Sequence, residues 1–206
     1  MKFDHVFWTY RQVARGCQLN SLVGFEDDFE IGLGTPVLHY FPDDVTVAMD
    51  PVFDKDTITP DNLRGVVRLV SGRMSEHLRG KNLQNVEYLP VSVLNHRGRP
   101  VQPQYEIIHP IHPIDCLDYT ACGITYCDPD DEEFIQEMKS FVLDIDKCGN
   151  FPPLFRIERM AEHVLIHRGL AKELDDAGFT GNGWIEPSDI GDVWLAGPLP
   201  IHLLDA

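Results

Sequence analysis

The chain has 206 residues, with 17 Lys or Arg against 33 Asp or Glu, which gives a formal net charge of −16. This length suits one large domain or two small ones and supplies enough apolar residues to bury a core. A strongly acidic surface repels nucleic acid and anionic membranes and attracts cationic partners, so we expect neither nucleic acid nor membrane binding.

The cysteines and the N-terminus indicate a cytoplasmic protein. Five cysteines are present, an odd number without the spacing of a disulfide framework: Cys17, Cys116, Cys122, Cys127 and Cys148. The N-terminal residues lack the long apolar core of a signal peptide, and no stretch approaches the roughly 20 apolar residues of a membrane span. Reduced thiols in a cytoplasm are therefore the simplest interpretation.

The first part of the chain predicts irregular β structure. Residues 3–10 are aromatic and strand-like, and two short apolar runs follow within residues 36–49. Segment 54–61 is polar and contains a proline, which favours a connection between two units. We therefore expect a β-rich N-terminal subdomain over residues 1–60 and an α+β domain over residues 61–206.

A clear local unit begins after this connection. Residues 66–70 form a β-branched run, and Ser71 is a suitable N-cap for a helix after it. Met74 and Leu78 are four positions apart, so they share one face of that helix, and Gly80 can end it. The pattern predicts a short strand that leads directly into a short helix.

A β-hairpin is predicted next. Residues 86–94 are typical of a strand, in which Pro90 indicates an edge or a bend. Residues 95–100 are rich in turn formers, and the chain returns as a strand over residues 105–111.

Residues 128–133 carry the strongest signals for the start of a helix. Asp128 suits the N-cap, Pro129 suits the first helical position, and the acids that follow suit the positive end of the helix dipole. The apolar stripe of this helix would consist of Phe134, Ile135, Met138, Phe141 and Val142. Residues 141–146 also fit a strand, which leaves the end of the helix open.

A second strand–helix unit follows the pattern of the first. Its elements are strands over residues 154–157 and 164–167 and a helix over residues 170–177. The apolar pattern of residues 69–78 recurs at residues 165–174. An internal duplication and a chance recurrence of a common pattern both explain this match.

His109, His112 and Cys116 are the residues most suited to metal or hydrolytic chemistry, because zinc accepts these ligand types. Their spacing is unfavourable, since the imidazoles of His-x-x-His point to opposite faces of an extended segment. A small metal-dependent or cysteine hydrolase that uses the His109/His112/Cys116 region stays an alternative hypothesis.

Other motifs of catalysis or ligand binding do not occur in the sequence. It contains no Gly-x-Ser-x-Gly elbow, no nucleotide-binding loop and no EF-hand loop. No stretch interleaves basic and aromatic residues as an oligonucleotide-binding surface would. We therefore expect no enzymatic activity and no cofactor or metal.

Several segments resemble a family of immunity proteins from bacterial polymorphic toxin systems. They are residues 67–78, 86–91, 114–118, 153–157, 164–174 and 177–181. The resemblance covers roughly residues 65–190 and leaves the N-terminal third outside it. It implies an antidote that is made beside a toxin delivered between competing bacteria and that neutralises this toxin by direct binding. It implies no catalytic residues.

The sequence therefore predicts an α+β protein with a β-rich N-terminal part followed by strand–helix units around a mixed sheet. We expect its partner to be a cognate protein toxin with a cationic surface, because acidic groups speed association with such a surface. A non-catalytic scaffold or assembly protein is the other alternative. The residues expected in the interface are Glu26, Asp27, Asp28, Asp130, Asp131, Glu132, Glu133 and Trp184.

Overall fold

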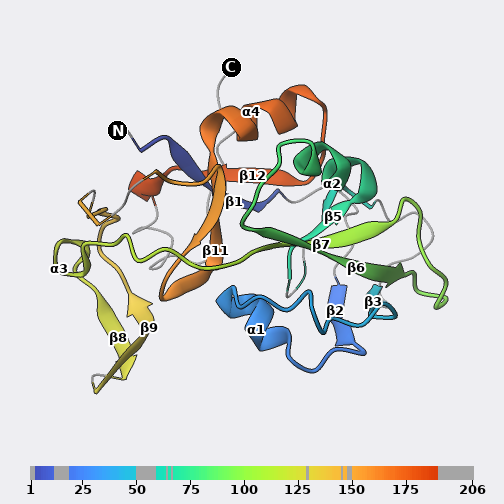
Figure 1. The fold of residues 1–206 in the computed structure, drawn as a ribbon, viewed down its shortest axis with the longest axis horizontal. Coiled ribbons are helices and arrows are strands. Elements are labelled where there is room, and N and C mark those ends of the chain that lie inside the picture. Colours follow the sequence, from blue (N-terminus) through green and yellow to red (C-terminus); the bar gives the residue numbers. More distant parts are fainter. Residues whose placement is uncertain are drawn as a thin grey trace.

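The computed structural model describes residues 3–11, 19–49, 59–63, 65, 67–128, 130–144, 146–147 and 150–189. Its strands and short helices form an α+β fold, which confirms the predicted fold class (Figure 1). One sheet has the order β2 (Leu19–Val23), β3 (Thr46–Met49), β6 (Val86–Leu94), β7 (Tyr105–Pro110), β5 (Leu69–Ser71) and β4 (Asn62–Leu63). The other has the order β10 (Leu154–Ile157), β11 (Met160–His167), β1 (His5–Tyr10) and β12 (Asn182–Ile185).

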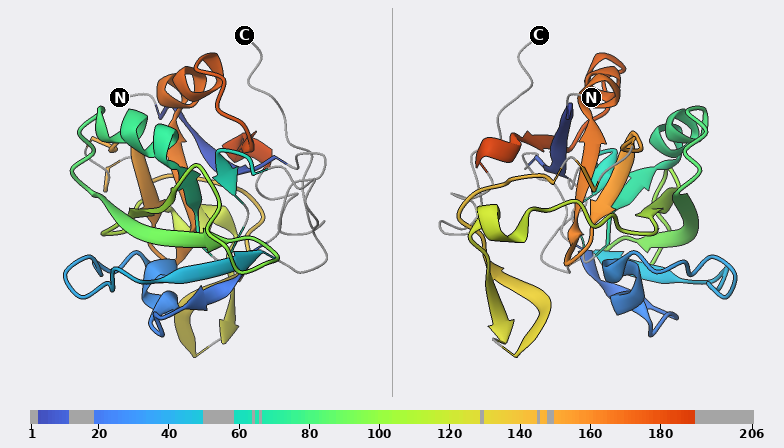
Figure 2. Two further views of the ribbon diagram at one scale, coloured as in Figure 1. Left: turned by 90° about the vertical axis from the view of Figure 1, so that its right-hand side faces the viewer. Right: turned by 60° about the vertical axis from the view of Figure 1, so that its left-hand side comes forward.

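The remaining elements are a separate hairpin and short helices. The hairpin consists of β8 (Thr125–Asp128) and β9 (Asp131–Glu137), and the helices are α1 (Asp28–Leu33), α2 (Gly72–Arg79), α3 (Tyr119–Cys122), α4 (Arg168–Asp176) and the 3₁₀ helix η1 (Pro187–Asp189). Helices α2 and α4 lie towards one end of the molecule, and α1 and the hairpin lie at the opposite end (Figures 1 and 2).

The strand–helix unit predicted after residue 65 is confirmed. The Ser71 hydroxyl accepts a hydrogen bond from the Met74 amide and so caps the N-terminus of α2. Met74 and Leu78 are fully buried, and Gly80 is the C-cap residue. The hairpin predicted over residues 86–111 is also confirmed, because β6 and β7 pair antiparallel.

The helix predicted from Asp128 is wrong. The described residues between 125 and 144 form no helix; instead β8 and β9 pair antiparallel, with Asp128 opposite Asp131. Aspartate favours tight turns as well as helix N-caps, and the Asp128 carboxylate accepts a hydrogen bond from the Asp130 amide, as in an Asx turn. Pairing with β8 therefore decides the structure of residues whose local pattern also suits a helix.

The two strand–helix units have the same topology. In the first, the strand order is β4-β5-β7-β6, and α2 connects β5 to β6. In the second, the order is β10-β11-β1-β12, and α4 connects β11 to β12. In both, each neighbouring pair is antiparallel. The strand between the two that the helix connects is β7 in the first unit and β1 in the second. β7 follows β6 in the chain, whereas β1 comes from the N-terminal part.

The residue pairings of the two units also agree. In each unit, the two strands that the helix connects pair with opposite edges of one strand between them. Both pair there with a single residue, which is Ile107 of β7 in the first unit and Phe7 of β1 in the second. The residues paired with them are Leu69 and Leu89 in the first unit and Leu165 and Ile185 in the second. Both pairs of positions are shifted by 96 residues, so topology and register together support an internal duplication.

Strands from the N-terminal part occur in both large sheets. β1 lies between β11 and β12, and β3 pairs parallel with β6, which makes the six-stranded sheet mixed. Both sheets therefore contain strands from both sides of residue 60, and the domain boundary expected there stays a prediction.

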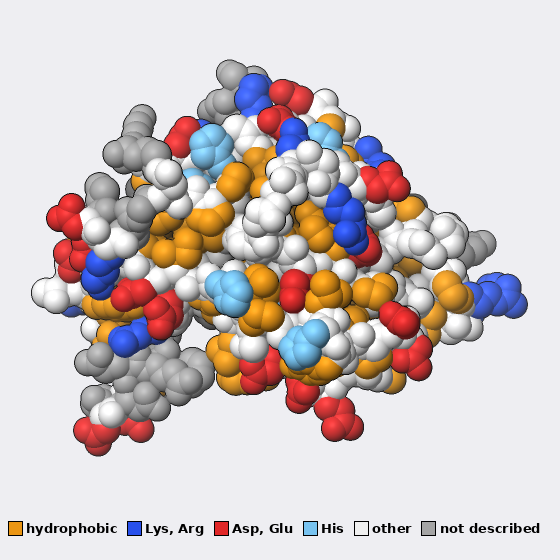
Figure 3. All heavy atoms as spheres, in the orientation of Figure 1, with side chains coloured by type: hydrophobic (Ala, Val, Ile, Leu, Met, Phe, Trp, Pro, Cys, Tyr) orange, Lys and Arg blue, Asp and Glu red, His pale blue; other side chains and the backbone are white. Residues whose placement is uncertain are grey.

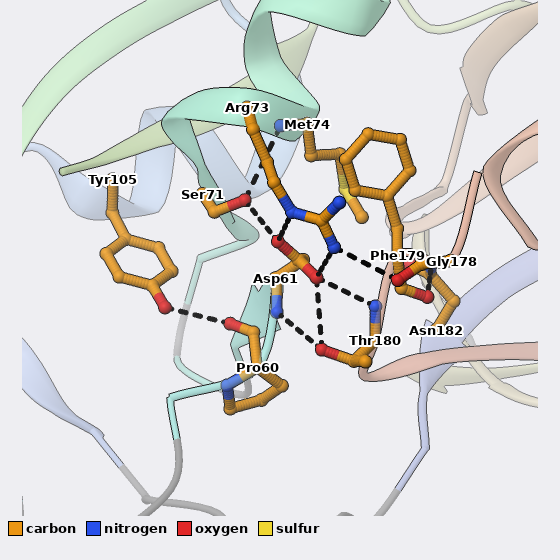
Figure 4. A network of polar contacts seen from close by, with 10 residues as sticks. All are labelled: Pro60, Asp61, Ser71, Arg73, Met74, Tyr105, Gly178, Phe179, Thr180 and Asn182. Atoms are coloured by element: carbon orange, nitrogen blue, oxygen red, sulfur yellow. Dashed lines mark hydrogen bonds and ion pairs between the residues drawn. The ribbon is translucent and has the colours of Figure 1, made fainter. Parts of the chain in front are cut away.

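A polar network joins the two units (Figure 4). The Asp61 carboxylate accepts hydrogen bonds from the Ser71 hydroxyl at 2.6 Å, from Arg73 Nε at 2.7 Å and from the Thr180 amide at 2.9 Å. Ser71 and Arg73 belong to the first unit, and Thr180 lies between α4 and β12 of the second. The buried carboxylate of Asp61 therefore connects the unit that contains α2 to the unit that contains α4.

Candidate partner-binding face

The exposed apolar side chains come from one stretch of the chain. Among the residues that the structure describes, the large apolar side chains that stay exposed are those of Val23, Phe29, Leu38 and Tyr40, at 64%, 60%, 51% and 43%. Contiguous exposed apolar groups mark interaction sites, whereas single ones need no explanation, so the recurrence of such groups in one segment makes this segment a candidate. We call residues 23–44, which carry all four, the α1 face.

Helix α1 presents Phe29 on its outer side. Ile31 is the buried residue of this helix and packs into a core cluster with strands β3 and β6, which leaves Phe29, two positions earlier, towards solvent. Gly34 ends the helix with a φ of 80°. A Cβ at this position would lie 2.8 Å from Cγ of Pro113, so only glycine fits here.

Buried aromatic rings support the exposed Tyr40. Its ring centroid lies 5.9 Å from that of Phe25, which in turn lies 4.8 Å from that of Phe41. Phe25 and Phe41 are both buried in the core cluster under the face. Tyr40 therefore packs against buried aromatic rings, while much of its own side chain stays accessible to solvent.

The α1 face is acidic throughout. Residues 19–49 contain six acidic residues and neither Lys nor Arg. Desolvation, together with the carboxylates of Asp27, Glu30 and Glu87, raises the pKa of Tyr40. Glu26 and Asp27 are exposed. The first three predicted interface acids, Glu26 to Asp28, belong to the segment that carries the exposed apolar groups, and their role in an interface stays a prediction.

The second predicted acidic group lies on the β8–β9 hairpin. Residues 125–137 also contain six acidic residues and neither Lys nor Arg, and Asp128 and Asp130 are exposed. Asp131, Glu132 and Glu133 belong to β9. The base of the hairpin is held by Arg159, which donates a hydrogen bond to the Tyr126 hydroxyl at 3.2 Å.

The charge of the molecule is therefore segregated. Residues 19–49 and 125–137 hold 12 of the 33 acidic residues and none of the 17 basic ones, which leaves 21 acidic and 17 basic residues elsewhere. The α1 face and the hairpin lie at the same end of the molecule (Figure 2). Along the lower edge of Figure 3, red acidic side chains are visible and blue basic ones are not.

Trp184 does not belong to this acidic end. Its side chain is 2% exposed, and its ring stacks on that of Trp8 with 6.3 Å between the centroids. Its indole N–H donates a hydrogen bond to Asp175 at 2.8 Å. The expected role of Trp184 as a partner-binding anchor is not supported by this placement, because the ring is part of the core under α4.

The residues of the alternative hydrolase hypothesis are not assembled into a site. His109 is fully buried, and its Nε2 lies 2.7 Å from the Thr35 carbonyl oxygen. His112 is exposed, whereas Cys116 is fully buried in an apolar cluster that contains neither histidine. Within the described part of the chain, no group of three or more His, Cys, Asp or Glu side chains is placed to hold a metal ion.

The sequence patterns did not reveal the apolar part of the α1 face. Phe29, Leu38 and Tyr40 occur in a region expected to hold strands and loops, and their exposure depends on which neighbours are buried. The one feature of the sequence that marks this region is that residues 19–49 contain no Lys or Arg.

Comparison with known proteins supplies the family. None of the described helices is long and apolar enough to cross a membrane. No curated protein matches the chain. The model of the immunity protein family Imm11 matches residues 18–189, which include the α1 face as well as the segments in which the resemblance was expected. The chain therefore belongs to the Imm11 family of immunity proteins.

Proposed function

We propose that this protein binds and neutralises a cognate bacterial toxin in the cytoplasm, and that the α1 face is its docking surface. The observation that carries the proposal is the combination of exposed apolar side chains and charge of a single sign on this face. Membership of an immunity protein family supplies the class of partner. Neutralisation by binding is stoichiometric and requires no catalytic step.

The apolar side chains supply the binding energy of this interface. A protein–protein interface of ordinary size buries about 1,600 Å² in total, and a few central residues contribute most of its free energy. Phe29 and Tyr40 are the aromatic anchors, since each presents a large exposed ring. Leu38 and Val23 add aliphatic area beside them.

The acids select a cationic partner. Because residues 19–49 contain no Lys or Arg, the docking surface of the toxin gains from basic side chains and is penalised for acidic ones. The hairpin, at the same end of the molecule, extends this negative field. Such a field accelerates association and weakens as salt is added.

Co-expression with the product of the neighbouring gene tests the proposed function. We expect that product to be toxic alone, to be harmless in the presence of this protein and to co-purify with it. A neighbouring product that is not toxic, or that stays toxic beside this protein, would remove the basis for the proposal.

Substitutions on the α1 face test the docking surface. Phe29→Ala with Tyr40→Ala should weaken binding by about 100-fold or more, because each removed hot-spot ring costs about 2 kcal/mol. Glu76→Lys is a matched control, since Glu76 is exposed on α2, away from the acidic end. Glu26→Lys with Asp27→Lys should weaken binding, whereas the control should not. Unchanged affinity in both double variants would exclude the α1 face.

A further inference from the structure

Three polar side chains hold the backbone behind the α1 face: two are buried, the third, Glu87, is partly buried, and each comes from a different strand. Glu87 lies on β6, His109 on β7 and Arg156 on β10. Their partners are backbone groups of residues 32–38, the segment that leads from the end of α1 to Leu38. We call Glu87, His109 and Arg156 the clasp.

Glu87 fixes the point where the chain passes from the core to the surface. One of its carboxylate oxygens accepts hydrogen bonds from the Val37 amide at 2.9 Å and from the Leu38 amide at 3.1 Å. The Val37 side chain is fully buried, and the next one, Leu38, is 51% exposed. The carboxylate therefore sets the direction in which the chain presents Leu38 and, two residues later, Tyr40.

His109, which lies opposite Glu87 in the pairing of β6 with β7, holds the same segment. A carbonyl oxygen can only accept a hydrogen bond, so the contact of 2.7 Å with Thr35 O requires that His109 Nε2 carries a proton. Burial lowers the pKa of His109 to about 4, so the ring is neutral at neutral pH. The charged groups that face it are Glu87, whose carboxylate lies 4.0 Å from Nε2, and Arg156.

Arg156 completes the clasp at the end of α1. Its buried guanidinium donates hydrogen bonds to the carbonyl of Gly32 at 3.1 Å and to that of Pro110 at 3.0 Å. The His112 amide adds a hydrogen bond to the Gly34 carbonyl at 3.0 Å. The segment behind the α1 face is thereby tied to both large sheets.

We propose that the clasp positions the α1 face for toxin binding, and that Glu87 in particular sets the affinity without touching the toxin. This inference rests on the proposed function of the α1 face. A surface loop that is held in its bound conformation loses less conformational entropy on association, so a fixed backbone at Val37 and Leu38 strengthens binding. The clasp residues are positioning residues, since they act through the backbone that they hold.

Two substitutions at one position separate positioning from general stability. In Glu87→Gln, the amide oxygen can still accept both backbone hydrogen bonds, whereas in Glu87→Ala nothing replaces them. We expect Glu87→Ala to accelerate hydrogen exchange at the Val37 and Leu38 amides of the isolated protein. We expect it to weaken binding of the toxin identified by co-expression by about tenfold, as 1 to 2 kcal/mol of lost preorganisation would. Glu87→Gln should restore both within about threefold.

Ile166→Val is the control for general destabilisation, because Ile166 is buried in the cluster under α2 and α4. It should lower the melting temperature and leave toxin affinity unchanged. Glu87→Ala that binds as tightly as the wild type, or Glu87→Gln that binds as weakly as Glu87→Ala, would overturn the positioning role. Failure of the Phe29 and Tyr40 variants to affect binding would instead overturn the proposed docking surface, so the two results are distinguishable.

Discussion

A single carboxylate, that of Asp61, joins the two structural units. It accepts hydrogen bonds from Ser71 and Arg73 of one unit and from the amide and hydroxyl of Thr180 in the other (Figure 4). Burial acts to raise the pKa of Asp61, but the hydrogen bonds from Arg73, Ser71 and Thr180 outweigh it and lower this pKa. The charged form of Asp61 is therefore the form that stabilises the fold.

Removal of this carboxylate should destabilise the protein. Asp61→Ala leaves the buried Ser71 hydroxyl and the Thr180 amide without their acceptor, and loss of one partner in such a network costs about 3 kcal/mol. Urea unfolding at pH 7 measures this difference in the free energy of unfolding. A loss below about 0.5 kcal/mol would show that the network contributes no more than an ordinary surface contact.

The contribution of Asp61 should depend on pH. Since its pKa is lower in the folded than in the unfolded protein, the stabilisation is fully present above the unfolded value of about 3.9 and is lost as the pH falls through the folded value. The difference in stability between the wild type and Asp61→Asn should therefore be constant near pH 7 and shrink below about pH 4. A difference that grows on acidification would contradict this assignment.

Local sequence patterns predict some helices and strands correctly and fail for others. Ser71, Met74, Leu78 and Gly80 specify α2 within one short stretch, so their pattern predicted the helix. Asp128 suits both a helix start and a turn, and only pairing between β8 and β9 decides between them. The clasp behind the α1 face could not be predicted either, because it joins residues about 50 to 120 positions apart, as Glu87 and Val37 illustrate.

The β8–β9 hairpin should affect the rate of toxin association more than the lifetime of the complex. Asp128→Asn with Asp130→Asn removes two exposed charges from the acidic end. We expect the association rate constant to fall by about twofold to fivefold at low salt, with the dissociation rate nearly unchanged. Stopped-flow binding at several salt concentrations measures both rates. Glu76→Gln on α2 is the control, and a reduction that persists at high salt would argue against steering.

The molecule contains two matched units, and β1 occupies in the second unit the position that β7 occupies in the first. β7 follows β6 directly along the chain, whereas β1 precedes every other strand of its sheet. Arg168 binds both Asp4, just before β1, and Glu186, just after β12, so these two strand ends lie together. The apolar repeat in the sequence indicated this relation, but only the pairing of β1 revealed which strand completes the second unit.

A circular permutant tests the match between the units. Joining residue 206 to residue 1 through a Gly/Ser linker and opening the chain between residues 15 and 16 places β1 after β12, in the order of β6 and β7. We expect this chain to fold cooperatively, with a circular dichroism spectrum like that of the wild type. A permutant that stays unfolded would show that β1 must begin the chain.

Protection from hydrogen exchange on toxin binding tests whether the α1 face is the docking surface. We expect peptides covering residues 23–44 to exchange more slowly in the complex than in the isolated protein, with smaller protection in residues 125–137. Peptides covering α2 and α4, at the other end of the molecule, should exchange at the same rate in both. Protection confined to α2 and α4, with residues 23–44 unchanged, would contradict the assignment of the α1 face as the docking surface.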